Sequence, residues 1–193
     1  IHKTKTDLNI DEEKISLMMG KNCHIVIYPV NQNKELNLVC IIRDKKYDPD
    51  NIKTLVNKVV TQNSNLEKVF EGDLKSWPLY FTPKILPSSN SKVFYIGDAF
   101  NGFLPTLAQG AGQSIESAHE LFNLIKDDKA EIQNTYFKER SRRAKIVKRR
   151  SNINFFVFHF SSSIMQTLRN FFIKFLVKRK SFVNSYLGTV YKN

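Results

Sequence analysis

The sequence is poor in the residues on which small secreted domains and metal-binding modules depend. Only two of its 193 residues are cysteines, Cys23 and Cys40, so a disulfide framework is excluded and both are expected to be small core residues. No cluster of cysteine and histidine has metal-ligand spacing, and no metal site is predicted. Seven glycines and six prolines are too few for a collagen-like or low-complexity chain. This composition suits a reducing compartment, and we expect a cytoplasmic protein.

Long apolar runs are also missing. The chain begins at Ile1, and its opening segment contains no apolar stretch of the kind found in signal peptides, so we expect the back part of a longer protein. Residues 155–160 and 171–177 are strongly apolar, but polar residues interrupt them, and a membrane span needs about 20 consecutive apolar residues. The 41% of hydrophobic residues is enough for a buried core, which excludes a disordered chain.

Acidic residues are scarce in the C-terminal region. Between Lys138 and Lys180 the chain has 13 basic residues and one acidic residue, Glu139, which accounts for the whole formal net charge of +12. Clustered basic residues are typical of surfaces that bind nucleic acid or anionic membranes. Nucleic-acid binding is not expected, because no recognised nucleic-acid fold accompanies the cluster. Peripheral contact with the inner face of the membrane stays open, beside the plainer interpretation of a solvated helix face.

Three segments near the start of the chain are predicted to be β-strands. They are apolar or β-branched over most of their length and cover residues 15–19, 23–29 and 36–42. The polar connection between the second and the third is short enough for a hairpin. His24 lies in one of these apolar strands and is interpreted as a packed histidine, with substrate contact as the alternative.

Helices are predicted where apolar residues recur every three or four positions. A first helix runs from Pro49 through residue 59, and a shorter one is expected near 66–70. Another is predicted over residues 112–126, and the pattern is helical from 131 to near the end of the chain. Strands in the first half and helices in the second indicate a mixed α and β protein.

The stretch around residues 93–112 has the strongest signs of a ligand site. Its apolar start, 93–96, is predicted to be a buried strand of a mostly parallel sheet, ending at Gly97 and Asp98. A carboxylate at the end of such a strand is well placed to accept hydrogen bonds from a ligand hydroxyl. After a loop, small residues at Gly110 and Gly112 let a planar or anionic group approach the free N–H groups of a helix start. The pattern suits a cofactor that has hydroxyl groups and develops negative charge.

This stretch also resembles a known motif. In order and spacing it is similar to the third FAD-binding fingerprint of the flavoprotein aromatic hydroxylases, the group that contains p-hydroxybenzoate, salicylate and ubiquinone-ring hydroxylases. The fingerprint stands here as Gly97-Asp98-Ala99-Phe100-Asn101, then Pro105, then Gln109-Gly110-Ala111. The chain departs from the family at Asn101, where histidine is frequent, and at Gly112, where asparagine is common.

The resemblance extends to both sides of the fingerprint. Residues 19–39 resemble the hairpin of the family's substrate domain, and residues 136–144 resemble the helix that follows the fingerprint. The N-terminal glycine-rich turn of the family has no counterpart in the sequence. The resemblance implies an α/β (α+β) chain, the C-terminal half of a two-domain FAD- and NAD(P)-binding flavin monooxygenase fold. Its parts would be a partial substrate domain (1–85), the end of the FAD domain (86–130) and a helical basic tail (131–193).

Roles for individual residues follow from the same resemblance. Asp98 would bind a ribityl or ribose hydroxyl of FAD, and N–H groups at the start of the following helix would face the N1 and O2 edge of the flavin. Pro105 would lie beside the flavin ring and the substrate, which makes it the candidate catalytic residue. The full set expected to bind the cofactor is Gly97, Asp98, Ala99, Pro105, Gln109, Gly110, Ala111 and Gly112.

The function implied by the resemblance is hydroxylation of an aromatic ring. NAD(P)H would reduce FAD, O2 would be captured as a flavin hydroperoxide, and a small phenolic or quinone-precursor ring would receive the oxygen. The alternative, from another class, is a non-catalytic module that uses its basic surface to bind a membrane or a partner.

Overall fold

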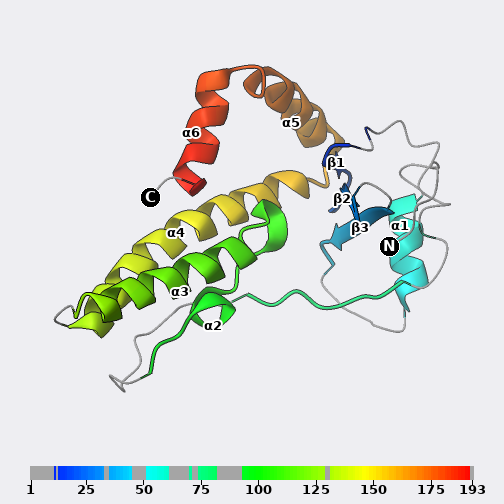
Figure 1. Ribbon diagram of the computed structural model, residues 1–193. Helices are drawn as coiled ribbons and strands as arrows, with labels where there is room; N and C mark the ends of the chain where they lie inside the picture. Colours follow the sequence, from blue (N-terminus) through cyan, green and yellow to red (C-terminus); the bar gives the residue numbers. More distant parts are fainter. Residues whose placement is uncertain are drawn as a thin grey trace. The chain divides into compact units, whose positions relative to one another are not determined.

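The chain divides into two compact units. The computed structural model describes residues 11, 13–32, 35–44, 51–60, 70, 74–81, 93–128 and 131–191 (Figure 1). The first unit consists of Ile1–Pro78 and Phe156–Phe175, and the second of Leu79–Phe155 and Leu176–Asn193.

The first unit contains a three-stranded antiparallel sheet in the order β1-β2-β3. Its strands are β1 (Ser16–Met19), β2 (Cys23–Val30) and β3 (Glu35–Ile42). The central strand β2 pairs with both neighbours, with Ile25 opposite Cys40 in β3. The three strands and the hairpin predicted from the sequence are confirmed.

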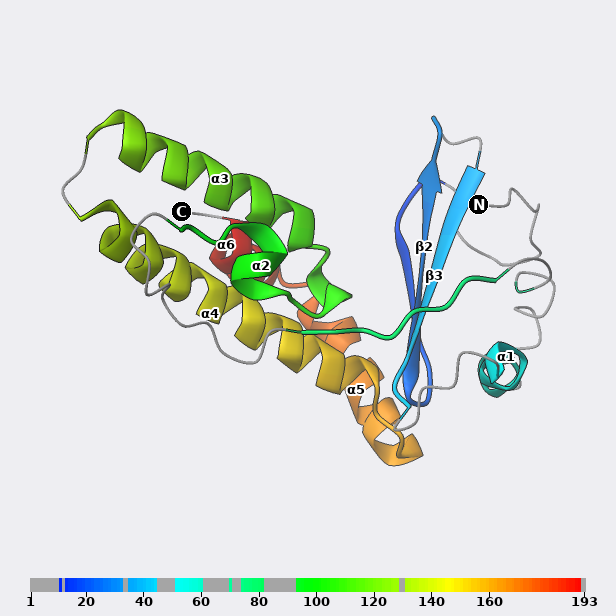
Figure 2. The same cartoon turned by 90° about the horizontal axis from the view of Figure 1, so that it is seen from below.

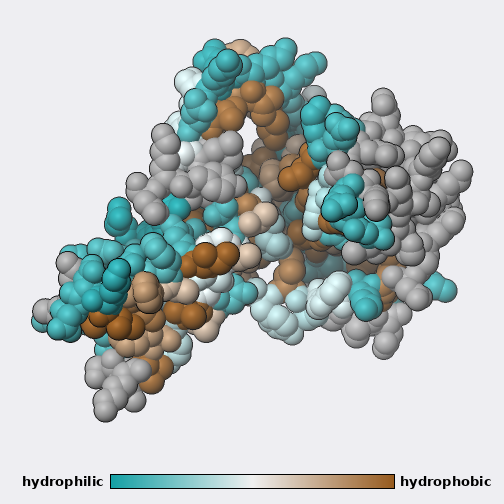
Figure 3. Space-filling model, in the orientation of Figure 1, coloured by the Kyte–Doolittle hydropathy of each residue, from teal (hydrophilic) through white to brown (hydrophobic). Residues whose placement is uncertain are grey.

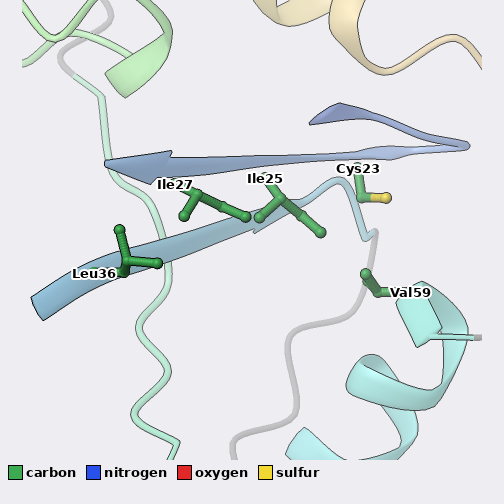
Figure 4. Close-up of a cluster of buried hydrophobic side chains, with 5 residues drawn as sticks. All are labelled: Cys23, Ile25, Ile27, Leu36 and Val59. Carbon is green, nitrogen blue, oxygen red and sulfur yellow. The ribbon is translucent and has the colours of Figure 1, made fainter. Parts of the chain in front are cut away.

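One face of this sheet carries a small apolar core. Cys23, Ile25 and Ile27 alternate along β2 and therefore point to the same side, where Leu36 of β3 joins them (Figure 4). Helix α1 (Ile52–Val60) adds Val59 to the cluster. This helix confirms the one predicted to follow Pro49, and the burial of Cys23 confirms its interpretation as a core residue.

The opposite face of β2 buries His24. Its side chain is 1% exposed, and its ring packs edge-on against those of Phe158 and His159, with centroids 5.2 and 4.8 Å away. Arg169, on helix α5 (Ser163–Leu176), donates a hydrogen bond to the carbonyl oxygen of Met19 at 3.3 Å. The interpretation of His24 as a histidine packed in the interior is confirmed.

The second unit is helical. It contains α2 (Gly97–Asn101), the 3-10 turn η3 (Pro105–Leu107), α3 (Gly110–Lys126), α6 (Lys180–Tyr191) and most of α4 (Ile132–Phe158). Helices α3 and α4 lie side by side in both views (Figures 1 and 2).

The core of the second unit is aromatic. Phe100, Tyr136 and Ala144 are buried together, and the ring of Phe100 packs edge-on against Tyr136 and Phe137 at centroid distances of 5.9 Å. Aromatic pairs in this arrangement add to the stabilisation from buried area alone. The cluster joins α2 to α4 and so fixes the short helix that follows residue 96.

Two expectations for the start of this unit are corrected. Residues 93–96 form neither a strand nor a helix, because no described segment pairs with their backbone, and Val93, Tyr95 and Ile96 are each at least 40% exposed. Residues 97–101 form α2 instead of a loop, since Gly97 turns the chain directly into a helix packed on α3.

The remaining helix predictions have clear outcomes. The helix predicted over 112–126 is confirmed, beginning two residues earlier at Gly110. The helical C-terminal region is confirmed as α4, α5 and α6. The short helix predicted near 66–70 lies outside the described residues except for Phe70. Among the helices that the structure describes, none has the length and apolar content needed to cross a membrane. Within the described part of the chain, a small antiparallel sheet combined with six α-helices confirms the mixed α+β class.

Candidate functional site

The site predicted from the sequence begins at a glycine that no other residue can replace without strain. Gly97 has φ of +57°, which side chains disfavour, and a Cβ atom placed there would lie 2.7 Å from Oγ of Ser114. Its N–H donates to Oγ of Ser117 at 3.1 Å. The turn into α2 is therefore held closely against α3 by its backbone, which leaves no room for a larger residue.

Helix α2 presents one polar residue outward and buries two others. Asp98 and Ala99 are exposed, whereas Phe100 and Asn101 face the interior. The carboxylate of Asp98 can therefore accept hydrogen bonds from a ligand at the surface. Asn101 is 3% exposed, and its Nδ2 donor has no partner among the residues that the structure describes. A buried donor without an acceptor is costly, so a bound group that accepted its hydrogen bond would stabilise the site.

The loop after α2 contains a turn with an exposed proline. Pro105 begins the 3-10 turn η3, and Ala108, which ends the turn, has φ of +52°. Pro105 itself is exposed. Two hydrogen bonds join this turn to helix α4. Oγ of Ser151 donates to the carbonyl oxygen of Leu104 at 2.5 Å, and Oγ1 of Thr106 donates to the carbonyl oxygen of Ser151 at 2.7 Å. Pro105 is thus displayed on a supported backbone.

The start of α3 is open to a ligand. None of the side chains that the structure describes caps this end, and the first helical hydrogen bond runs from the N–H of Gln113 to the carbonyl oxygen of Gln109 at 2.8 Å. The preceding N–H groups therefore have no intrahelical acceptor. Of the atoms in the described residues, a Cβ atom at Gly110 would meet none within 4 Å, and one at Gly112 would meet only Oε1 of Gln109 at 3.9 Å. Open space beside uncapped N–H groups fits a planar group with an anionic edge.

A partly buried ionic network supports the first turns of α3. The guanidinium of Arg140, on α4, donates to Glu120 at 2.9 Å and to the side-chain oxygen of Gln113 at 2.9 Å. Beside it, Nε of Arg143 donates to Glu116 at 3.1 Å. Burial raises the pKa of the Glu120 carboxyl, against the opposing effect of the Arg140 hydrogen bond. The network fixes α3 on α4 and so holds the open helix start in place.

A tyrosine that the sequence did not single out as a site residue anchors the segment before the site. The hydroxyl of Tyr136 donates to the carbonyl oxygen of Tyr95 at 2.8 Å, and burial raises its pKa. The spacing of acidic residues at 116 and 120 and of arginines at 140 and 143 was the available sign of the neighbouring ionic network. This spacing does not show, however, that the acidic residues of one helix pair with the arginines of another.

The expected cofactor-binding residues thus have definite places. They come from three consecutive elements, α2, η3 and the start of α3, all in the second unit. Asp98, Ala99, Pro105, Ala111 and Gly112 are exposed, Gly97 and Gly110 are half-buried, and Gln109 is buried. The residues present fit a ligand that brings hydroxyl groups and an anionic edge.

Comparison with known proteins identifies the family. The squalene epoxidase family model matches residues 3–190. Salicylate hydroxylase of Pseudomonas putida is 27% identical over 142 residues, which cover 65% of this chain and 32% of that protein. Two 3-amino-4-hydroxybenzoate 2-monooxygenases of Streptomyces platensis, PtmB3 and PtnB3, are each 25% identical over 81% of this chain and 42% of their own length. The chain therefore spans about a third to two fifths of these curated relatives, and its resemblance to monooxygenases is confirmed. Because the family model covers nearly its whole length, the chain belongs to the squalene epoxidase family.

Proposed function

We propose that this chain is the C-terminal part of an FAD-dependent monooxygenase that uses NAD(P)H and O2 to hydroxylate a small aromatic ring. The observation that carries the proposal is the start of α3, which has no side-chain cap among the described residues and has open space beside Gly110 and Gly112. The N–H of Gly97 binds α3 and so places this helix start beside α2, which exposes Asp98. The names of the salicylate and aminohydroxybenzoate relatives support an aromatic substrate, phenolic or a quinone precursor.

Each residue has a physical role in this proposal. Asp98 accepts hydrogen bonds from a ribityl or ribose hydroxyl of FAD. The N–H groups around Gly110, Ala111 and Gly112 face the N1 and O2 edge of the flavin, where oriented amides in a dry site stabilise negative charge. Pro105 packs against the ring, where its lack of an N–H and its fixed φ give a rigid apolar contact. Bound FAD supplies the redox and oxygen chemistry, and these residues bind it, orient it and exclude water.

We further propose that residues 1–85 are part of a substrate domain, 86–130 the end of the FAD domain and 131–193 a helical tail. In that arrangement, further chain packs on the second unit. Support comes from the apolar stripe of α3, where Ile115, Phe122 and Ile125 are all more than half exposed, and from the short share of the relatives that the chain spans. Apolar surface lies along α3 in Figure 3. A cytoplasmic location is part of the proposal and rests on the low cysteine content.

The test begins with cofactor binding by the protein at its native length. We expect it to bind FAD, and Asp98→Asn to weaken the binding by about tenfold or more, because a hydrogen bond to a charged group is stronger than one to a neutral group. Asp127→Asn removes another exposed carboxylate, at the far end of α3, and is the matched control. Substrate-dependent oxidation of NAD(P)H with consumption of O2 then tests the reaction. A native protein that binds no flavin would refute the proposal.

A second candidate function is binding to an anionic membrane surface without catalysis. It is favoured by α5, on which Ile164, Leu168, Phe171, Phe172 and Phe175 are all at least 45% exposed, and by the three basic residues at 178–180. Sedimentation with vesicles containing anionic lipid distinguishes the two functions. Salt-sensitive binding to these vesicles by a protein that takes up no flavin would favour this candidate.

A further inference from the structure

The turn that displays Pro105 is held by a chain of polar side chains that reaches the C-terminal helix α6. Ser151 is fully buried, and its hydroxyl donates to the carbonyl oxygen of Leu104, immediately before Pro105. One helical turn later on α4, Nδ2 of Asn154 donates to the carbonyl oxygen of Thr106 at 3.3 Å. The two carbonyl groups that flank Pro105 are thus both bound by side chains on the same face of α4.

The amide of Asn154 is in turn oriented by Tyr186 of α6. The tyrosine hydroxyl donates to Oδ1 of Asn154, which leaves Nδ2 directed at the carbonyl oxygen of Thr106. An asparagine amide whose oxygen has no partner can turn over and present its oxygen where the donor is needed. A hydrogen bond to Oδ1 therefore selects the one orientation of Asn154 that supports the turn.

Tyr186 is itself held in place. The guanidinium carbon of Arg150, on α4, lies 4.9 Å from the centre of the Tyr186 ring. The ring of Phe182, on α6, stacks on the Tyr186 ring with a centroid distance of 5.8 Å. A cation over an aromatic face is attractive. Tyr186 is half-buried in this setting. The hydroxyl is consequently presented to Asn154 by contacts from both α4 and α6.

We propose that Tyr186 and Asn154 are positioning residues for the Pro105–Leu107 turn, so that the C-terminal helix α6 determines how well this turn fits against FAD. The inference rests on the proposed function, because it assigns the flavin to the surface that Pro105 presents. The two residues act in series, from the Tyr186 hydroxyl to the Asn154 amide and from that amide to the carbonyl oxygen of Thr106. Neither needs to touch the cofactor.

The experiment uses the protein at its native length and the variants Tyr186→Phe, Asn154→Ala and the double variant. Tyr80→Phe is the matched control, because it removes the same oxygen from a tyrosine that is 83% exposed. Two properties are measured. The first is hydrogen exchange at the backbone amides between Thr106 and Gln109, which reports on the turn without any cofactor. The second is the affinity for FAD, together with the absorption band of the bound flavin.

We expect both single variants to speed exchange in the turn and to weaken FAD binding by about two- to tenfold, the range expected for one hydrogen bond. The double variant should be no worse than Asn154→Ala, because the two residues act through one path. Tyr80→Phe should match the unaltered protein.

Two results would overturn the proposal. One is a Tyr186→Phe variant whose exchange and FAD affinity equal those of Tyr80→Phe, and the other is a double variant whose effects are the sum of the single ones. Failure of the proposed function has a different signature, which is an unaltered protein that binds no FAD. In that case the role toward FAD is refuted as well, and the exchange data alone decide whether Tyr186 holds the turn.

Discussion

Lowering the pH is expected to destabilise the protein through His24. The imidazole is 1% exposed, and its Nδ1 lies 3.1 Å from Nε2 of His159. Burial, and to a lesser extent the neighbouring His159, together lower the pKa of His24 from 6.5 to about 4. Nε2 of His24 has no partner among the described residues, so a proton added there would create a buried charge without an acceptor.

The size of the effect follows from the two pKa values. Because the pKa is lower in the folded state than in the unfolded state, the unfolded chain takes up the proton first, and stability falls as the pH drops below 6.5. Linkage with pKa values of 6.5 and about 4 gives a loss of about 1.4 kcal/mol at pH 5.5 and about 2.5 kcal/mol at pH 4.5. The loss approaches its limit, about 3.4 kcal/mol, well below pH 4.

Urea unfolding followed by far-UV circular dichroism at pH 7, 5.5 and 4.5 measures this loss. Other groups also titrate in this range, so the contribution of His24 is the difference between the unaltered protein and His24→Phe, which keeps a ring beside Phe158 but cannot be protonated. His119→Gln removes a histidine from the exposed side of α3 and is the control. If His24→Phe loses as much stability between pH 7 and 4.5 as the unaltered protein does, the reasoning is wrong.

Three other changes have defined outcomes. Gly97→Ala should destabilise the protein by about 1–2 kcal/mol through its positive φ, and by more through the contact with Ser114; adding Ser114→Ala should recover only the second part in urea unfolding. Arg140→Met should lower the free energy of unfolding by about 3 kcal/mol by leaving the half-buried Glu120 without its cation, and combining it with Glu120→Gln should restore part of the loss. Burial raises the pKa of the Cys40 thiol to about 12, so alkylation by iodoacetamide at pH 8 should be far slower in the folded protein than in urea; equal rates would contradict this.

Short-range patterns in the sequence predicted much of the fold. The β-branched and aromatic composition of β2 and the apolar recurrence along α3 reflect local backbone preferences, so both elements were predicted to within two residues. The presence of glycine at position 97 also has a local explanation, since the turn there requires a φ of +57°, which glycine adopts without strain. The placing of the candidate site on α2, η3 and the start of α3 followed from the resemblance of the fingerprint, and its role in FAD binding stays a proposal.

Contacts between distant parts of the chain could not be predicted in this way. The apolar stripe at Ile115, Phe122 and Ile125 correctly indicated a helix, yet this stripe is exposed while the face with Gln113 and Ser117 is buried against its neighbours. Residues 93–96 have the composition of a buried strand, but a strand also requires a partner, and none of the described segments pairs with it.

The sequence by itself determined the helices other than α2, the hairpin, the basic C-terminal region and the order of the residues in the fingerprint, because each depends on neighbours within a few positions. Only the tertiary structure decided which polar groups meet. His24 and His159 are 135 residues apart, and Tyr186 reaches Asn154 across 32 residues. Buried polar groups must find partners wherever the packed elements bring them, and that packing is set by the whole chain.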